Sequence, residues 1–177
     1  MMVQIANLLI VLGLVLQADG DARALETLAT RVAAYVELHR REEARLPALD
    51  PASDAAQISR HQVALAARLG SARHGAREGD IFVPEAAARL RRILAPHFAG
   101  AEGARARAAM FEEMPARVLL RVNEIYPDVP LAIVPPRILN DLPRLPEELE
   151  YRFIGRYLIL RDVHANTVVD FAADVIP

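Results

Sequence analysis

The chain contains no cysteine and no lysine, and only 5% of its 177 residues are aromatic. Without cysteine it has no disulfide, no thiolate metal site and no cysteine-linked lipid anchor. The formal net charge is only −2, and this near balance excludes the basic surface that nucleic-acid binding requires. Every basic residue is arginine, and together with the abundant alanine this composition is typical of GC-rich bacterial genomes.

Motifs that mark the large enzyme classes are also missing. The sequence has no P-loop, no dinucleotide-binding glycine pattern, no Gly-x-Ser-x-Gly and no zinc-protease motif. Its length suits one domain, with or without an export segment, and is sufficient to bury a core. These absences favour a non-enzymatic protein over an enzyme of a familiar class.

An apolar segment opens the chain. Residues 1–16 are apolar except for Gln4 and Asn7. A bilayer span needs about 20 such residues, whereas the hydrophobic region of a secretory signal has about 7–15. The length therefore favours an export signal over a membrane-spanning helix.

Small residues follow this segment, and cleavage after Gly20 or Ala22 fits export. We expect residues 1–20 to be a signal peptide and residues 21–177 to be a single domain that is periplasmic or secreted. No arginine precedes the apolar run, which departs from an ordinary signal. The alternatives are an uncleaved membrane anchor through residues 3–16 or an N-terminal core helix.

The first half of the mature chain is predicted to be helical. Apolar residues at three- and four-residue steps predict a long helix over residues 21–46. Asp50 as N-cap and Pro51 at the first helical position predict the start of a second helix, and the short link implies an antiparallel hairpin. Further helices are predicted after Pro84 and over residues 101–114. The buried face of the first helix is predicted to contain Leu25, Leu28, Val32, Val36 and His39.

Three histidines fall on or near this hairpin, namely His39, His61 and His74. An antiparallel hairpin would allow these three side chains to meet as metal ligands. However, neither helix contains a Glu-x-x-His or a His-x-x-x-His pair, the spacings typical of helical metal sites. We therefore expect ordinary histidines at the surface or at the edge of the core, and neither a metal ion nor a cofactor.

The C-terminal part has a different composition. Residues 117–123 alternate in a way that predicts a strand, and a proline-rich connection follows it. Aromatic and β-branched residues then predict three strands over residues 151–171. Gly155 suits a two-residue type II′ turn between the first two strands, and Asn166 suits the left-handed position of the second turn. Sequential strands usually pair, so an antiparallel meander is expected.

The predicted fold class is therefore α+β. A helical N-terminal half, built from an antiparallel helical hairpin and further helices over residues 21–114, packs on a small C-terminal antiparallel β-meander. The proline-rich connection and the sheet occupy residues 115–177.

The region of the second turn of the meander contains the most chemically suggestive cluster of the chain, namely Asp162, His164, Asn166 and, across the strand, Asp170. Asp162 and His164 are two residues apart and point to one face in an extended strand, and Asp170 lies across the hairpin. A carboxylate beside an imidazole orients a general base or binds a metal. The alternative is that Asp162 and Asn166 hydrogen-bond the turn while His164 faces solvent.

A second group of candidate ligand-binding residues lies in the loop before the third helix. Arg77, Asp80 and Glu85 have the chemistry of a polar ligand site, and Asn166 is a further binding candidate. The simpler interpretation is that Asp80 holds the turn and Phe82 fills the core.

Two stretches resemble an uncharacterised group of small exported bacterial proteins. They are residues 76–85, with the core Gly-Asp-Ile-Phe, and residues 149–171, with Glu-Tyr-Arg-Phe-Ile-Gly-Arg and Asp-Val-His-Ala-Asn. The resemblance implies export, a helical N-terminal half and a C-terminal sheet. It implies no activity and assigns no functional residue.

Three functions are compatible with the sequence. The preferred one is a non-enzymatic exported module that is associated with the envelope and binds a protein partner. The first alternative is a metal-dependent or acid–base hydrolase that uses Asp162, His164 and Asp170, with Asp80 or Glu85 arriving from the earlier loop. The second is a membrane-tethered accessory subunit of a larger complex, whose only membrane contact is the uncleaved N-terminal segment.

Overall fold

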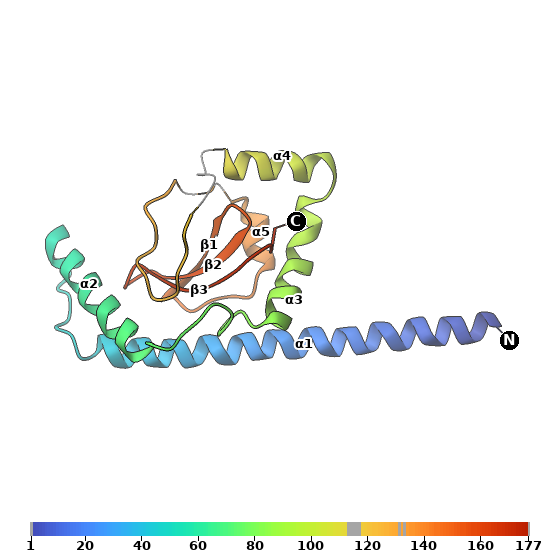
Figure 1. The fold of residues 1–177 in the computed structure, drawn as a ribbon, viewed down its shortest axis with the longest axis horizontal. Coiled ribbons are helices and arrows are strands. Elements are labelled where there is room, and N and C mark those ends of the chain that lie inside the picture. Colours follow the sequence, from blue (N-terminus) through green and yellow to red (C-terminus); the bar gives the residue numbers. More distant parts are fainter. Residues whose placement is uncertain (1, 113–117, 131, 133, 177) are drawn as a thin grey trace.

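Helix α1 (Met2–Glu43) runs along one side of the molecule, and the remaining elements gather beside its C-terminal half (Figure 1). The computed structural model describes residues 2–112, 118–130, 132 and 134–176. Helices precede a C-terminal three-stranded antiparallel sheet, which confirms the predicted α+β class.

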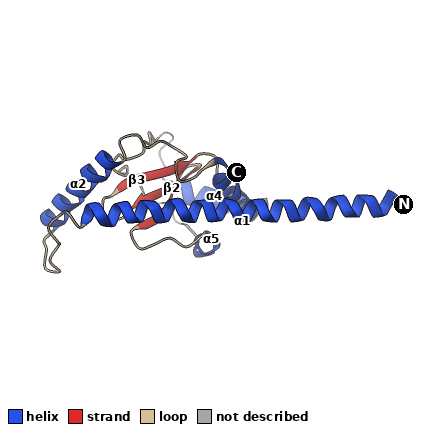
Figure 2. Ribbon diagram, turned by 90° about the horizontal axis from the view of Figure 1, so that it is seen from below, coloured by secondary structure: helices blue, strands red, loops and turns tan. Residues whose placement is uncertain are grey.

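The N-terminal half of α1 extends well beyond the body of the protein (Figures 1 and 2). The predicted helix started at residue 21, whereas the observed one continues through Gly20 and Ala22 without a break. Residues 17–20 are exposed, and Ala24 is the first buried residue described in this helix. In the described part of the chain, no helix is both long and apolar enough to cross a membrane.

Helix α2 (Ala55–Ala72) follows α1 and turns back beside its C-terminal end (Figure 1). The prediction that it begins at Asp50 is wrong. Asp54 is the N-cap, and it forms a reciprocal capping box with Gln57, which satisfies two backbone groups at the helix start. Asp50 instead accepts a hydrogen bond from the N–H of Ala52 in the connecting turn.

Three helices and a 3-10 turn complete the helical part. They are α3 (Pro84–Leu94), η1 (Ala95–Phe98), α4 (Gly100–Phe111) and α5 (Pro136–Asp141). Pro84 occupies the first turn of α3, as predicted. The helix packs against α1, and its buried Leu90 and Leu94 join the main core.

The sheet is the predicted meander, with β1 (Leu149–Ile154), β2 (Tyr157–Asp162) and β3 (Thr167–Ala172) in that order. Ile154 pairs with Tyr157, so the first turn has two residues. Gly155 has a φ of 53° and Asn166 a φ of 52°. Both values lie in the left-handed region that the sequence predicted for these two positions.

Each face of the sheet is covered. One face contributes Phe153, Leu158 and Leu160 to the main core with α1 and α3. The other carries Ile159 and Val168 and packs against the chain segment that precedes α5. The sheet is therefore packed on both sides, with Asp162 at the end of β2 and Asp170 within β3.

The predicted strand over residues 117–123 is wrong, although residue 117 itself lies outside the described residues. None of the described residues 118–123 belongs to a strand, and the nearest pairing is an isolated bridge between Ile125 and Thr167. Asn123, with a φ of 68°, turns the chain away from an extended path. The alternating Val118, Leu120 and Val122 nevertheless pack on the sheet, which explains the period-two pattern.

Candidate functional site

Asp162 ends strand β2 and is completely buried. Its Oδ2 accepts a hydrogen bond from the hydroxyl of Tyr35 at 2.7 Å and lies 2.6 Å from Nδ1 of His39. Its Oδ1 accepts from the backbone N–H groups of His164 at 2.9 Å and Ala165 at 2.7 Å. One carboxylate thus connects helix α1 to the turn between β2 and β3.

The protonation of this buried pair follows from its contacts. Burial raises the pKa of the Asp162 carboxyl, but hydrogen bonds from His39, Ala165 and Tyr35 outweigh burial and hold that pKa below its usual range. Burial lowers the pKa of His39, but the hydrogen bond and charge of Asp162, with Glu43, outweigh it and raise that pKa. An ionised carboxylate only accepts hydrogen bonds, so Nδ1 of His39 carries a proton.

The other nitrogen of His39 faces a second carboxylate. Nε2 of His39 lies 3.2 Å from Oε2 of Glu43, one helical turn further along α1. Nδ1 of His164 lies 3.1 Å from Oε1 of the same carboxylate. The ring centroids of the two histidines are 5.2 Å apart. Glu43 therefore sits between two imidazoles that come from opposite ends of the sequence.

Helix α2 brings a third imidazole to this carboxylate. Nε2 of His61 lies 3.7 Å from Oε1 of Glu43. The same His61 lines a cavity of about 340 Å³ between α2 and the connection that leads to it. His74, in contrast, is exposed beyond the end of α2, so it is His164 and not His74 that joins the other two histidines.

The side chains of His39, Glu43 and His164 form what we call the metal-type cluster. Their potential ligand atoms all lie within 4.8 Å of one another. Imidazole nitrogen and carboxylate oxygen are ligands that zinc accepts. Metal-binding histidines almost always donate their second N–H to a carboxylate, which fixes the ring and directs the remaining nitrogen. Asp162 makes this contact to His39, so the arrangement has the chemistry of a metal site with its supporting residue.

Sequence reasoning missed this cluster, although one part of it is visible in the sequence. The search for Glu-x-x-His and His-x-x-x-His pairs overlooked His39 and Glu43, which form a His-x-x-x-Glu pair on one helical face. Asp162 and His164 were predicted as candidates, and the structure brings both to the same place. Tyr35 was not singled out at all.

Asp170 has a different environment from Asp162 and His164. Its carboxylate accepts hydrogen bonds from the backbone N–H groups of Gly79, Ile81 and Phe82 at 2.9, 2.7 and 2.7 Å. Burial raises the pKa of Asp170 more than these hydrogen bonds lower it. Asp170 therefore fastens the loop before α3 and contributes no atom to the metal-type cluster.

The four predicted binding residues take up local roles. Asp80 accepts a hydrogen bond from the N–H of Arg77 and so closes the turn, as the simpler interpretation proposed. Glu85 is exposed in the first turn of α3. The side-chain oxygen of Asn166 accepts two hydrogen bonds from Arg161. These residues do not converge with the metal-type cluster.

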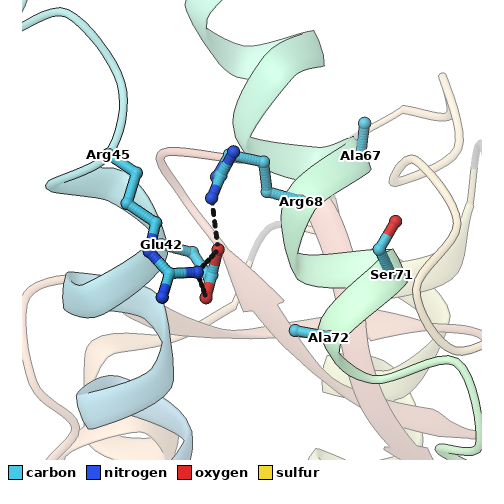
Figure 3. Close-up of a pocket in the computed structure, with 6 residues that line it drawn as sticks. All are labelled: Glu42, Arg45, Ala67, Arg68, Ser71 and Ala72. Carbon is cyan, nitrogen blue, oxygen red and sulfur yellow. Dashed lines mark hydrogen bonds and ion pairs between the residues drawn. The ribbon is translucent and has the colours of Figure 1, made fainter.

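A cavity of about 480 Å³ lies where the end of α1 meets α2. Arg45 and Arg68 both reach the carboxylate of Glu42, which is 6% exposed (Figure 3). The hydrogen bond from Arg68 joins α2 to α1 at 2.9 Å. This contact, one residue before Glu43, holds α2 at the distance that places His61 near the cluster.

Comparison with protein-family models, curated proteins and solved structures gave no match to this chain.

Proposed function

We propose that this protein is an exported metal-binding module, and that its metal-type cluster holds one divalent transition-metal ion of the zinc class. Nε2 of His39, the carboxylate of Glu43 and Nδ1 of His164 supply the ligands. Asp162 is a supporting residue that fixes the ring of His39.

One observation carries the proposal. His39 is fully buried, and its Nδ1 is hydrogen-bonded to Asp162. Its other nitrogen, Nε2, is therefore the one that faces Glu43. A zinc ion with bonds of about 2.0–2.1 Å and tetrahedral angles separates neighbouring ligand atoms by about 3.3 Å. The two nitrogen–oxygen distances in the cluster are close to this separation, at 3.2 Å to Oε2 and 3.1 Å to Oε1 of Glu43, and the ligand atoms of the three residues all lie within 4.8 Å of one another.

This proposal replaces two expectations from the sequence. The expected absence of a metal rested on missing helical motifs, and the pair His39 and Glu43 supplies a motif that was not considered. The alternative hydrolase used Asp162, His164 and Asp170 together. Because Asp170 is occupied by the loop before α3, only the first two of these residues remain in the proposal.

Titration of the chelator-treated protein with Zn²⁺ in a calorimeter tests the proposal. We expect one ion per chain, and we expect Glu43→Gln and His164→Asn to abolish or strongly weaken binding. His74→Asn is the matched control, because His74 is an exposed histidine outside the cluster, and we expect it to bind like the unaltered protein. Absence of binding by the unaltered protein, or equal binding by Glu43→Gln, would contradict the proposal.

A location outside the cytoplasm is the second part of the proposal. Its support is the apolar sequence of residues 1–16 together with the extension of the N-terminal half of α1 beyond the body (Figure 1). The same extension also favours a second candidate, a tethered subunit that keeps this segment and uses it to reach a protein partner.

N-terminal sequencing of the protein from fractionated bacterial cells separates the two candidates. A chain that begins at Asp21 or Arg23 in the periplasmic or secreted fraction supports export with cleavage. An intact N-terminus in the membrane fraction supports the tether. An intact chain confined to the cytoplasmic fraction would contradict both.

A further inference from the structure

The three ligands of the metal-type cluster differ in their exposure to solvent. The side chain of His39 is completely buried, whereas that of Glu43 is 32% exposed and that of His164 is 42% exposed. On the buried side, Asp162 lies 2.6 Å from Nδ1 of His39 and accepts a hydrogen bond from Tyr35. The cluster therefore has an inner side that the protein fills and an outer side where two ligands reach solvent.

The cluster has three protein ligands within the part of the chain that the structure describes. His39, Glu43 and His164 are the residues whose ligand atoms all lie within 4.8 Å of one another. His61 approaches Glu43, with its Nε2 at 3.7 Å from Oε1, but it does not belong to this group. Asp162, whose two oxygens both accept hydrogen bonds, is also outside it. Zinc prefers four ligands, so one position of the bound ion is left without a described protein ligand.

The direction of this fourth position follows from the buried ligand. In a tetrahedral shell, the other three positions all point away from the first ligand. Nδ1 of His39 is hydrogen-bonded to Asp162, so an ion bound to Nε2 lies on the side of the ring that faces Glu43. Glu43 and His164 take two of the three remaining positions, and both are partly exposed. The last position therefore points to the outer side of the cluster.

We propose that the ion keeps this fourth position open to solvent, and that the position binds a small anion with an oxygen donor, of the carboxylate or hydroxamate class. The inference rests on the metal site proposed above and assigns its class. Structural zinc sites are closed by four protein ligands, whereas sites with three protein ligands keep the fourth position for water or substrate. Ligating histidines are neutral, so Glu43 is the charged ligand of the three. It leaves one positive charge of a divalent ion for the anion to balance.

An open position determines how the ion exchanges with other molecules. An incoming ligand bonds to the ion at the fourth position while His39, Glu43 and His164 still hold it. In a shell closed by four protein ligands, one of these must dissociate first, and that dissociation limits the rate. The metal-type cluster is therefore suited to an ion that is taken up and handed over, rather than to one that holds the fold together.

Cobalt(II) in place of zinc makes the fourth position visible, because the absorption of Co²⁺ in visible light changes when one of its ligands is replaced. We expect acetohydroxamate to shift the absorption bands of the one-to-one Co²⁺ protein in a saturable titration, and dialysis to restore the original spectrum. His61→Ala and the matched control His74→Ala should give the same shift as the unaltered protein. Bound Co²⁺ whose spectrum does not respond to acetohydroxamate would overturn the open position. A response that appears only in His61→Ala would also overturn it, because His61 would then fill the position.

A second measurement follows the removal of Zn²⁺ by an excess of a chelator that changes colour on binding the ion. We expect the rate to rise in proportion to the chelator concentration, since the chelator enters the open position before the protein ligands leave. A rate that is independent of the chelator concentration would overturn the open position while leaving the three-ligand site intact. Failure of the unaltered protein to bind Co²⁺ or Zn²⁺ at all would instead overturn the underlying metal proposal.

Discussion

At the scale of single residues, Asp162 has four hydrogen bonds to lose. Each of its two carboxylate oxygens accepts two hydrogen bonds. The donors to Oδ2 belong to α1, and those to Oδ1 belong to the β2–β3 turn. Removal of one partner from a buried charged pair leaves the other charge without compensation, which typically costs about 3–5 kcal/mol. The residue therefore matters for stability as well as for the orientation of His39.

We predict that Asp162→Asn lowers the free energy of unfolding by about 3 kcal/mol, because an amide NH₂ group in place of Oδ2 accepts a hydrogen bond from neither Tyr35 nor His39. Urea denaturation of the metal-free protein measures this loss. Asp174→Asn is the control, since Asp174 forms a largely exposed ion pair with Arg156, and its loss should change stability by less than about 1 kcal/mol. Equal effects of the two substitutions would contradict the role of Asp162.

The pair of His39 and Asp162 also predicts a pH dependence of stability. The pKa of His39 is raised in the folded protein, so its contribution is complete below the unfolded value of about 6.5 and is lost as the pH rises through the folded value. The pKa of Asp162 is lowered, so its contribution is complete above about pH 3.9 and is lost as the pH falls through the folded value. The two contributions overlap between about pH 3.9 and pH 6.5.

We therefore expect the difference in unfolding free energy between the unaltered protein and His39→Gln to be larger at pH 5 than at pH 9. Denaturation at both pH values in the presence of a chelator measures it, so that metal ions make no contribution. The same difference at the two pH values would show that the charge on His39 plays no part in stability.

At the scale of elements, the loop before α3 depends on the sheet for its shape. Asp170 of β3 accepts from three backbone N–H groups of this loop, and Gly79 there has a φ of 85°. A buried backbone donor without a partner costs about 1–3 kcal/mol. The sheet thus fixes the loop, and the loop in turn sets the start of α3.

We predict that Asp170→Ala lowers the free energy of unfolding by about 3 kcal/mol and accelerates amide exchange at Gly79, Ile81 and Phe82, because these donors lose their acceptor. Zinc affinity should be unchanged, since Asp170 is not part of the metal-type cluster. Asp80→Ala, which removes an exposed turn contact in the same loop, should have a smaller effect. A loss of zinc binding in Asp170→Ala would place this residue in the site after all.

The elements that sequence reasoning predicted correctly are those determined locally. Gly155 and Asn166 have backbone requirements that are visible in the sequence, and they placed both turns of the meander. The start of α2 was predicted at the wrong residue because Asp50 and Asp54 are both good N-caps. Only Asp54 has a partner three residues later, Gln57, that completes a capping box. The segment 117–123 misled the prediction because packing on a sheet gives the same alternation as pairing within one.

The candidate site was predictable only in part, because its residues are brought together by tertiary packing. Asp162 and His164 are neighbours in sequence, and their proximity to each other was expected. Their contacts to His39 and Glu43 join residues more than 120 positions apart (|i−j| of 123 and 121). No local pattern specifies which helix lies against the end of β2, and so the partners of these two residues followed only from the fold.

At the scale of the whole molecule, the described side-chain contacts between α1 and the body begin near residue 21. Residues 17–20 are exposed, and the first side chain described in α1 that contacts α3 is Asp21, which forms ion pairs with Arg89 and Arg92. Ala24 and Leu28 then enter the core. The folded unit therefore starts close to the predicted cleavage position.

We predict that a chain beginning at Asp21 has the same free energy of unfolding as the full chain, within about 0.5 kcal/mol. Surface changes away from packed contacts have effects of this size. A chain beginning at Leu28 should be clearly less stable, because it lacks the Asp21 ion pairs and the buried Ala24. Matched denaturation curves of the three chains measure this. A large loss on removal of residues 1–20 alone would show that the projecting segment folds back onto the body.

The unbroken course of α1 has a mechanical consequence. An α-helix advances about 1.5 Å per residue, so the stretch from residue 16 to His39 is a stiff spacer of about 35 Å. If the outer end of that spacer is fastened to a surface, the imidazoles stand at a constant height above it. If it is cut away, the same groups are free to diffuse, so the proposed cleavage would decide whether the proposed metal carrier is stationary or mobile.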